Sequence, residues 1–186
     1  MTSKSNIPAW FGCVVDLEVS ENETRESAAA CDLGLYEGKK EIISVLDELI
    51  ETLRDGQQGF RQAAEGVSDP KLKSLFRDYS DQRSRFVTAL QTEVRKLGED
   101  KPEDDSSAPG ALHCGWINLK AAVTGGDEDA ILDECERGED SAVEEFHKAA
   151  EDDLPPALQE IVLRQYAEIK AAHDRIRGLR DAVKMS

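Results

Sequence analysis

The segments "FRQAAEGVSDPKL" at 60–72 and "FHKAAEDDLPPAL" at 146–158 are two copies of one pattern. The Phe, both Ala, the Glu, the Pro and the Leu coincide at a constant offset of 86 residues. The Phe and Ala residues share one face of a helix, and the Pro fits the first turn of the next helix. The repeat therefore predicts one helical hairpin used twice, and two hairpins make a four-helix bundle.

Apolar residues at steps of three and four predict four long helices around these hairpins. The helical pattern starts at Lys39 and stops at "SDP", residues 68–70, whose Ser or Asp can cap the next helix and whose Pro fits its first position. The second helix keeps its apolar face to Leu97. The third is expected at 127–151, and the fourth carries an apolar stripe over 158–183.

The connection between the two hairpins is long, from Gly98 to Gly126. Its first part, 98–110, is rich in Pro, Ser and acids and is typical of a linker. The stretch "ALHCGWINLKAAV" at 111–123 predicts a short helix that covers roughly 20 Å and is anchored by Trp116. A connection of this size can travel the length of the bundle, which is the crossover of the ferritin-like arrangement.

Three stretches also carry a family resemblance: "GALHCGWINLKAAVTGGDEDAILDECERGED" at 110–140, "DELIETLRDGQQGFRQAAE" at 47–65 and "LPPALQEIVLRQYAEIKAAHDRIRGLRD" at 154–181. Together they resemble a bacterial four-helix-bundle family of unknown function in the ferritin-like superfamily. The resemblance covers roughly 38–183 and implies the ferritin-like fold, with no activity attached. The superfamily suggests a role in stress tolerance.

Residues 1–37 are expected to form a separate N-terminal extension, with the bundle domain at 38–186. The apolar stretch "IPAWFGCVVDL" is followed by a polar segment without clear periodicity. A disordered tail is one interpretation, and docking on the bundle or on a partner is the other. Trp10 and Phe11 are the candidate contacts for a protein partner or a second copy of the chain.

Composition excludes several classes of partner. The 186 residues carry a formal net charge of -16. Binding to nucleic acid or to an anionic membrane surface relies on Lys and Arg, so neither is expected. No apolar run is long enough to span a membrane. The four cysteines form no Cys-x-x-Cys pair, which favours a cytoplasmic protein with reduced thiols.

One Glu-x-x-His motif, Glu144 to His147, has the spacing of a bundle metal ligand pair. Each helical residue turns by about 100°, so both side chains lie roughly 140–160° from Ala142 at the centre of the buried face. We therefore expect Glu144 and His147 to face solvent.

A second set of polar residues falls on the inward faces of the four helices. These are Gln57, Arg83, Glu139 and His173. They are expected at one level and could form a polar layer across the middle of the bundle. One carboxylate, one imidazole and an opposing Arg make a poor di-metal site. We predict instead that Arg83 and Glu139 form a buried ion pair, with Gln57 and His173 satisfying the remaining polar groups.

Two functions remain open at this point. The first is a non-enzymatic helical bundle that acts by binding or assembly, without a cofactor and without catalytic residues. The alternative is a ferritin-like protein that binds iron or manganese at a degenerate or single-metal site, for which Glu139 and His173 are the candidate ligands. Cys135 lies on the apolar stripe and is expected to be a buried structural thiol.

Overall fold

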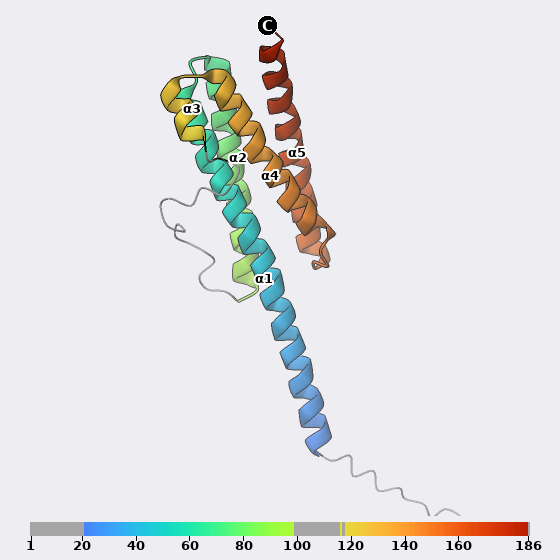
Figure 1. The fold of residues 1–186 in the computed structure, drawn as a ribbon. Coiled ribbons are helices and arrows are strands. Elements are labelled where there is room, and N and C mark those ends of the chain that lie inside the picture. Colours follow the sequence, from blue (N-terminus) through green and yellow to red (C-terminus); the bar gives the residue numbers. More distant parts are fainter. Residues whose placement is uncertain (1–20, 99–115, 117, 186) are drawn as a thin grey trace, which may run out of the picture. The chain divides into compact units, whose positions relative to one another are not determined.

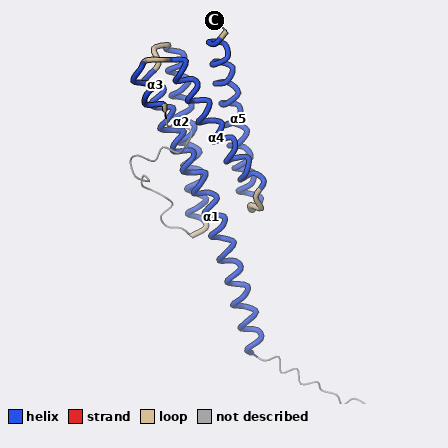
Figure 2. The backbone as a smooth tube through the Cα atoms, viewed as in Figure 1, coloured by secondary structure: helices blue, strands red, loops and turns tan. Residues whose placement is uncertain are grey.

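The computed structural model describes residues 21–98, 116 and 118–185, with side chains described from Gly38 onward. Within these residues the secondary structure is helical, joined by turns, and contains no strand (Figures 1 and 2). The helices are α1 (Glu21–Gly66), α2 (Pro70–Lys96), α3 (Leu119–Gly125), α4 (Glu128–Glu151) and α5 (Pro156–Lys184). The chain divides into two compact units, Met1–Gly38 and Lys39–Ser186, and the packing below concerns the second.

The start of α2 follows the predicted capping chemistry. Pro70 occupies the first turn of α2, and the Asp69 carboxylate accepts a hydrogen bond from Lys71 N–H at 2.7 Å. The Asp127 carboxylate does the same for Asp129 and Ala130 at the start of α4. Gly126, between α3 and α4, has φ +65°, the left-handed conformation that glycine adopts most easily.

Two helix boundaries differ from the sequence prediction. The helix expected from Lys39 begins at Glu21, because this segment is rich in Ala, Glu and Leu and contains no proline, although it lacks an amphipathic stripe. The crossover helix expected at 111–123 covers only Leu119–Gly125, about 10 Å of rise. Residues 111–115 and 117 lie outside the described residues, as do Trp10 and Phe11.

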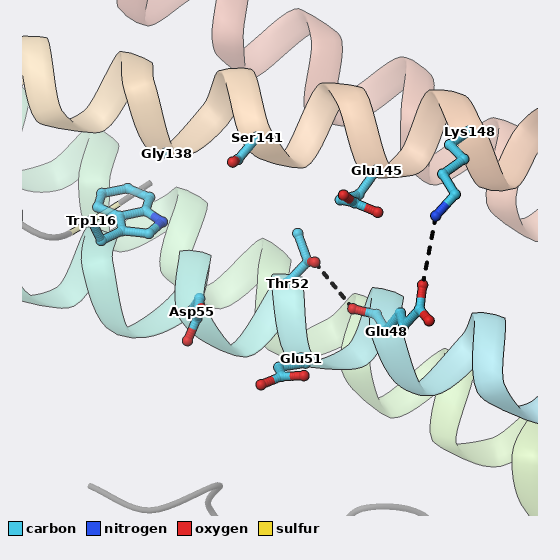
Figure 3. Close-up of a pocket in the computed structure, with 9 residues that line it drawn as sticks. All are labelled: Glu48, Glu51, Thr52, Asp55, Trp116, Gly138, Ser141, Glu145 and Lys148. Carbon is cyan, nitrogen blue, oxygen red and sulfur yellow. Dashed lines mark hydrogen bonds and ion pairs between the residues drawn. The ribbon is translucent and has the colours of Figure 1, made fainter. Parts of the chain in front are cut away.

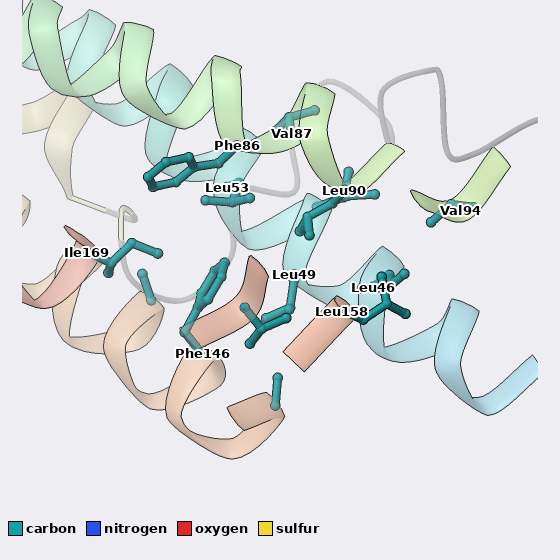
Figure 4. Close-up of a cluster of buried hydrophobic side chains, with 14 of the residues drawn as sticks. Leu46, Leu49, Leu53, Phe86, Val87, Leu90, Val94, Phe146, Leu158 and Ile169 are labelled. Atoms are coloured by element: carbon teal, nitrogen blue, oxygen red, sulfur yellow. The ribbon is translucent and has the colours of Figure 1, made fainter. Parts of the chain in front are cut away.

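The buried apolar side chains form two clusters, each built from all four long helices. The first cluster takes 46–53 of α1, 86–94 of α2, 142–149 of α4 and 158–169 of α5, with Leu154 from the turn before α5 (Figure 4). The second takes Phe60–Ala64 of α1 with Val67 just after it, Phe76 of α2, Ile131–Cys135 of α4 and Ile176 of α5, together with Trp116 and α3.

The residues that each long helix contributes to the two clusters show the direction in which that helix runs. Helices α1 and α5 run from the first cluster toward the second, whereas α2 and α4 run from the second toward the first. The starts of α2 and α4 are also joined, because the Glu128 carboxylate accepts hydrogen bonds from the N–H groups of Ser68 and Asp69 at 2.5 and 3.2 Å. Since α2 and α4 are parallel, the chain between them must return along the long axis.

Trp116 anchors the last part of this connecting segment against α1 and α4. Its side chain is 3% exposed, and its indole ring lies between Gly59 of α1 and Gly138 of α4 (Figure 3). A Cβ atom at either glycine would overlap the ring. Seven residues further on, Val123 lies against Gly66, where a Cβ atom would be 2.7 Å from Val123 Cγ2. The segment from Trp116 to Val123 therefore runs along α1 in the same direction.

We predict that Gly138→Ala lowers the free energy of unfolding by about 1–3 kcal/mol, because the added methyl group displaces the indole ring from a packed core. Gly178→Ala is the matched control, since Gly178 is an exposed position inside α5 with open space around its Cα. That variant should instead gain up to about 1 kcal/mol from helix propensity. Urea unfolding followed by circular dichroism measures both, and an unchanged midpoint in Gly138→Ala would contradict the placement of Trp116.

Candidate functional site

A charged pair lies in the interior where the two core clusters meet. Arg83 of α2 and Glu139 of α4 are both fully buried, and Arg83 Nη2 donates to Glu139 Oε2 at 2.5 Å. The guanidinium carbon of Arg83 is 5.7 Å from the Phe60 ring centre and 5.9 Å from the Phe86 ring centre. Phe60 belongs to the second cluster and Phe86 to the first, so the guanidinium joins the two. The predicted contact between Arg83 and Glu139 is confirmed.

The ion pair is only partly satisfied by hydrogen bonds. Gln82 Oε1 accepts from Arg83 Nη1 at 2.5 Å, but Arg83 Nε and Glu139 Oε1 have no hydrogen-bond partner among the described residues. Burial raises the pKa of the Glu139 carboxyl above its usual value, and the charge and hydrogen bond of Arg83 offset part of this rise. Desolvation therefore cancels much of the attraction between the two side chains.

Gln57 was expected to form a hydrogen bond with the Arg83–Glu139 pair, and the structure places its side chain elsewhere. Beside Gln57 in α1, Gly56 lies next to the Arg83 methylene groups, and a Cβ atom there would be at an ordinary contact distance of 3.6 Å from Arg83 Cγ. Gln57 is half-buried, and its main-chain oxygen accepts from Ser80 Oγ at 2.9 Å. No hydrogen bond within the described part of the chain joins the Gln57 side chain to Arg83, and Gln82 supplies that contact.

His173 of α5 is buried but turns toward carboxylates at the edge of the core. Its Nε2 is 2.8 Å from Asp140 Oδ1, and its Nδ1 is 3.1 Å from Asp174 Oδ1. The His173 side chain is 10% exposed, whereas the side chains of Asp140 and Asp174 are 64% and 57% exposed. The hydrogen bonds of the described residues do not join His173 to Arg83 or Glu139, so it lies beside the ion pair and not within its network.

Glu136, Asp140 and His173 form the one group of potential metal ligands found in the described part of the chain. One ligand atom from each lies within 4.8 Å of the others. Of the predicted candidates, His173 belongs to this group and Glu139 does not. Glu136 and Asp140 were missed, although they stand four residues apart on α4, on either side of Glu139. A search for carboxylates one helical turn apart would have found them.

Two arginine side chains of α5 already contact the Glu136 carboxylate, where a metal ion would have to bind. Arg180 Nη1 contacts Glu136 Oε2, and Arg177 Nε is 3.7 Å from Glu136 Oε1. One turn earlier on α4, Asp133 is 2.7 Å from Lys184 Nζ. Acids of α4 therefore face bases of α5 along the seam between the two helices, which lie side by side in Figure 1. The carboxylate of Glu136 is already balanced by positive charge.

Two other predicted features lie where the sequence placed them. Glu144 and His147 are exposed, and His147 Nδ1 is 3.9 Å from Glu151 on the same helix. The Glu-x-x-His motif therefore faces solvent, as predicted. Cys135 is fully buried in the second cluster, and burial together with the charges of Glu139 and Glu134 raises the pKa of its thiol well above the usual value. It stays protonated and is no nucleophile.

Residues 41–152 match the family described as Domain of unknown function (DUF2383). The chain belongs to this family. The DUF2383 region contains α2, α3 and α4 with the Arg83–Glu139 pair, and it ends before α5, which carries His173. No curated protein matches the chain. None of the helices in the described part of the chain is both long and apolar enough to cross a lipid bilayer.

The raised pKa of Glu139 predicts how stability depends on pH. The folded chain holds the Glu139 proton more tightly than the unfolded chain, so the contribution of this group is largest below the usual pKa of 4.5 and is lost as the pH rises through the raised value. Glu139→Gln cannot ionise and lacks this loss. The free energy of unfolding of the parent relative to Glu139→Gln should therefore fall as the pH rises above about 4.5.

Urea unfolding at several pH values measures this difference. Glu144→Gln, at an exposed position five residues away, is the matched control and should follow the parent. A parent chain that gains stability over Glu139→Gln as the pH rises would show that the attraction of Arg83 outweighs the burial of Glu139.

Proposed function

We propose that this DUF2383 protein is a ferritin-like four-helix bundle that acts by binding a partner and not by metal-dependent catalysis. The fold part of the proposal is supported by the helix directions. Helices α2 and α4 run parallel, α1 and α5 run opposite to them, and the segment from Trp116 to Val123 returns along α1. This is the order expected of a bundle with one long crossover.

The observation that carries the functional part is the Arg83 guanidinium in the central layer. A ferritin-like di-metal centre takes a Glu from each of two helices and a Glu-x-x-His from each of the other two. Here α2 places the positive charge of Arg83 between Phe60 and Phe86, where it repels a metal cation. The carboxylate of Glu139 is engaged by that charge. The imidazole of His173 turns outward to Asp140.

Metal content tests this proposal. The chain, expressed with added iron and manganese and purified without a His tag, should contain far less than one metal ion per chain by mass spectrometry. Glu139→Ala should leave this value unchanged, because Glu139 is paired with Arg83. About one ion per chain that disappears in Glu139→Ala, and remains in Glu144→Ala, would overturn the proposal and make the central layer a metal centre.

A second candidate function, metal binding at Glu136, Asp140 and His173, is favoured by one observation. Both ring nitrogens of His173 face carboxylate oxygens. A neutral imidazole has one donor and one acceptor nitrogen, so one of these contacts needs a second proton or a metal ion. Asp174 would then orient the ring from Nδ1, and Nε2 would be the ligand. Two carboxylates and an imidazole suit manganese, iron or zinc, although Arg177 and Arg180 oppose the added charge.

The second candidate predicts one site when the metal-free chain is titrated with Mn²⁺ or Zn²⁺ in a calorimeter. His173→Ala removes a ligand and should weaken binding by at least about tenfold. His147→Ala is the matched control, because His147 is the exposed histidine of α4. Equal affinity in His173→Ala and His147→Ala would reject the site at Glu136, Asp140 and His173.

A further inference from the structure

The ion pair between Arg83 and Glu139 contains two buried polar atoms that need a hydrogen-bond partner. Arg83 Nη2 donates to Glu139 Oε2, whereas Arg83 Nε and Glu139 Oε1 have no partner among the described residues. Both side chains are only 1% exposed, so bulk solvent does not reach these atoms. An unpaired buried donor or acceptor is costly, and nearly all such atoms in folded proteins have a partner.

The two unpaired atoms lie next to the contact that the ion pair already makes. The guanidinium group is planar, and its Nε–H bond points in the same direction as one N–H bond of Nη2, toward the Glu139 carboxylate. Nη1 lies on the other side of the group and donates to Gln82. Oε1 is bonded to the same carbon as Oε2, so it is close to Nε across the contact. One of the two contacts of a bidentate pair is therefore formed directly, and the other is not.

Helix α1 leaves space for one heavy atom beside Arg83 Nε. A Cβ atom at Gly56 would lie 3.7 Å from Nε and 3.6 Å from Cγ of Arg83, which are ordinary van der Waals distances. The three heavy atoms nearest to that Cβ would all belong to Arg83. A molecule much larger than one heavy atom would have to displace side chains of the packed core.

Charge and hydrogen bonding select the occupant of this space. A cation would be repelled by Arg83 and an anion by Glu139, so a neutral molecule is favoured. It has to accept a hydrogen bond from Nε and donate one to Oε1. Water has the right size and does both, and buried waters in proteins bind polar groups that lack another partner.

We propose that one buried water molecule bridges Arg83 Nε and Glu139 Oε1 beside Gly56. The two charged groups are then joined by one direct and one water-mediated contact, and neither unpaired atom remains without a hydrogen bond. This inference goes beyond the proposed function, because it assigns the central layer a ligand that is neither a metal ion nor a partner protein.

NMR spectroscopy of the full chain, prepared with isotope-labelled arginine, tests this site. The Nε–H signal of Arg83 can be assigned through its contacts with the rings of Phe60 and Phe86. We expect a negative nuclear Overhauser effect between this proton and water, which indicates a water molecule that stays bound for longer than the chain takes to tumble. The sign of the rotating-frame cross peak distinguishes this contact from proton exchange.

Two glycine variants locate the water molecule. Gly56→Ala places a methyl group in the space beside Nε at ordinary contact distances, so the variant should fold and lose the cross peak with water. Gly178→Ala is the matched control, because the same substitution inside α5 has nothing within 4 Å. It should keep the cross peak. Circular dichroism of both variants checks that the fold is intact.

Two results would overturn the inference. Absence of the cross peak in the parent chain would mean that no long-lived water contacts Nε. A cross peak that persists in Gly56→Ala would mean that the water contacting Nε does not lie beside Gly56. A crystal structure of the parent gives an independent answer. Water within about 3.2 Å of both Nε and Oε1 supports the proposal, and a direct contact of that length between the two atoms contradicts it.

Discussion

The buried contact between Arg83 and Glu139 is the constraint on which the arrangement of the helices depends. It joins the two helices that run parallel, α2 and α4, at the level where one apolar cluster gives way to the other. An apolar core tolerates sliding of one helix along another, because one leucine contact resembles the next. A buried charge does not, since moving α2 by one turn would leave both side chains unpaired. The contact therefore costs desolvation energy but sets the register.

Parallel α2 and α4 also determine what the connecting segment must do. The chain has to return along α1, and it can lie close only where side chains are absent. Gly59 and Gly138 provide that space for Trp116, and Gly66 provides it for Val123. The same packing turns the edge of the indole ring toward the pocket between α1 and α4. The topology and the pocket beside Trp116 thus share one cause, the close approach of the returning segment to two helices.

The sequence was most informative where a feature depends on a single helix or on its nearest neighbours. The repeat, the caps and the inward positions of Arg83 and Glu139 follow from periods of three and four residues, so they could be predicted. The start of α1 at Glu21 could not, because helix-forming composition without a stripe leaves the helix and the coil close in energy. The contact of Asp140 with His173 depends on how α4 and α5 are rotated toward each other, which neither sequence stripe specifies.

The internal repeat gives the ion pair one more consequence. At the offset of 86 residues, Glu139 of the second hairpin corresponds to Leu53 of the first, and Arg83 of the first corresponds to Ile169 of the second. Leu53 and Ile169 are both fully buried in the first cluster. Two copies of the first hairpin would set Arg83 against Leu53, and two copies of the second would set Glu139 against Ile169. Each mismatch would bury a charge without a partner. The ion pair therefore favours packing of the first hairpin against the second over packing of two identical hairpins.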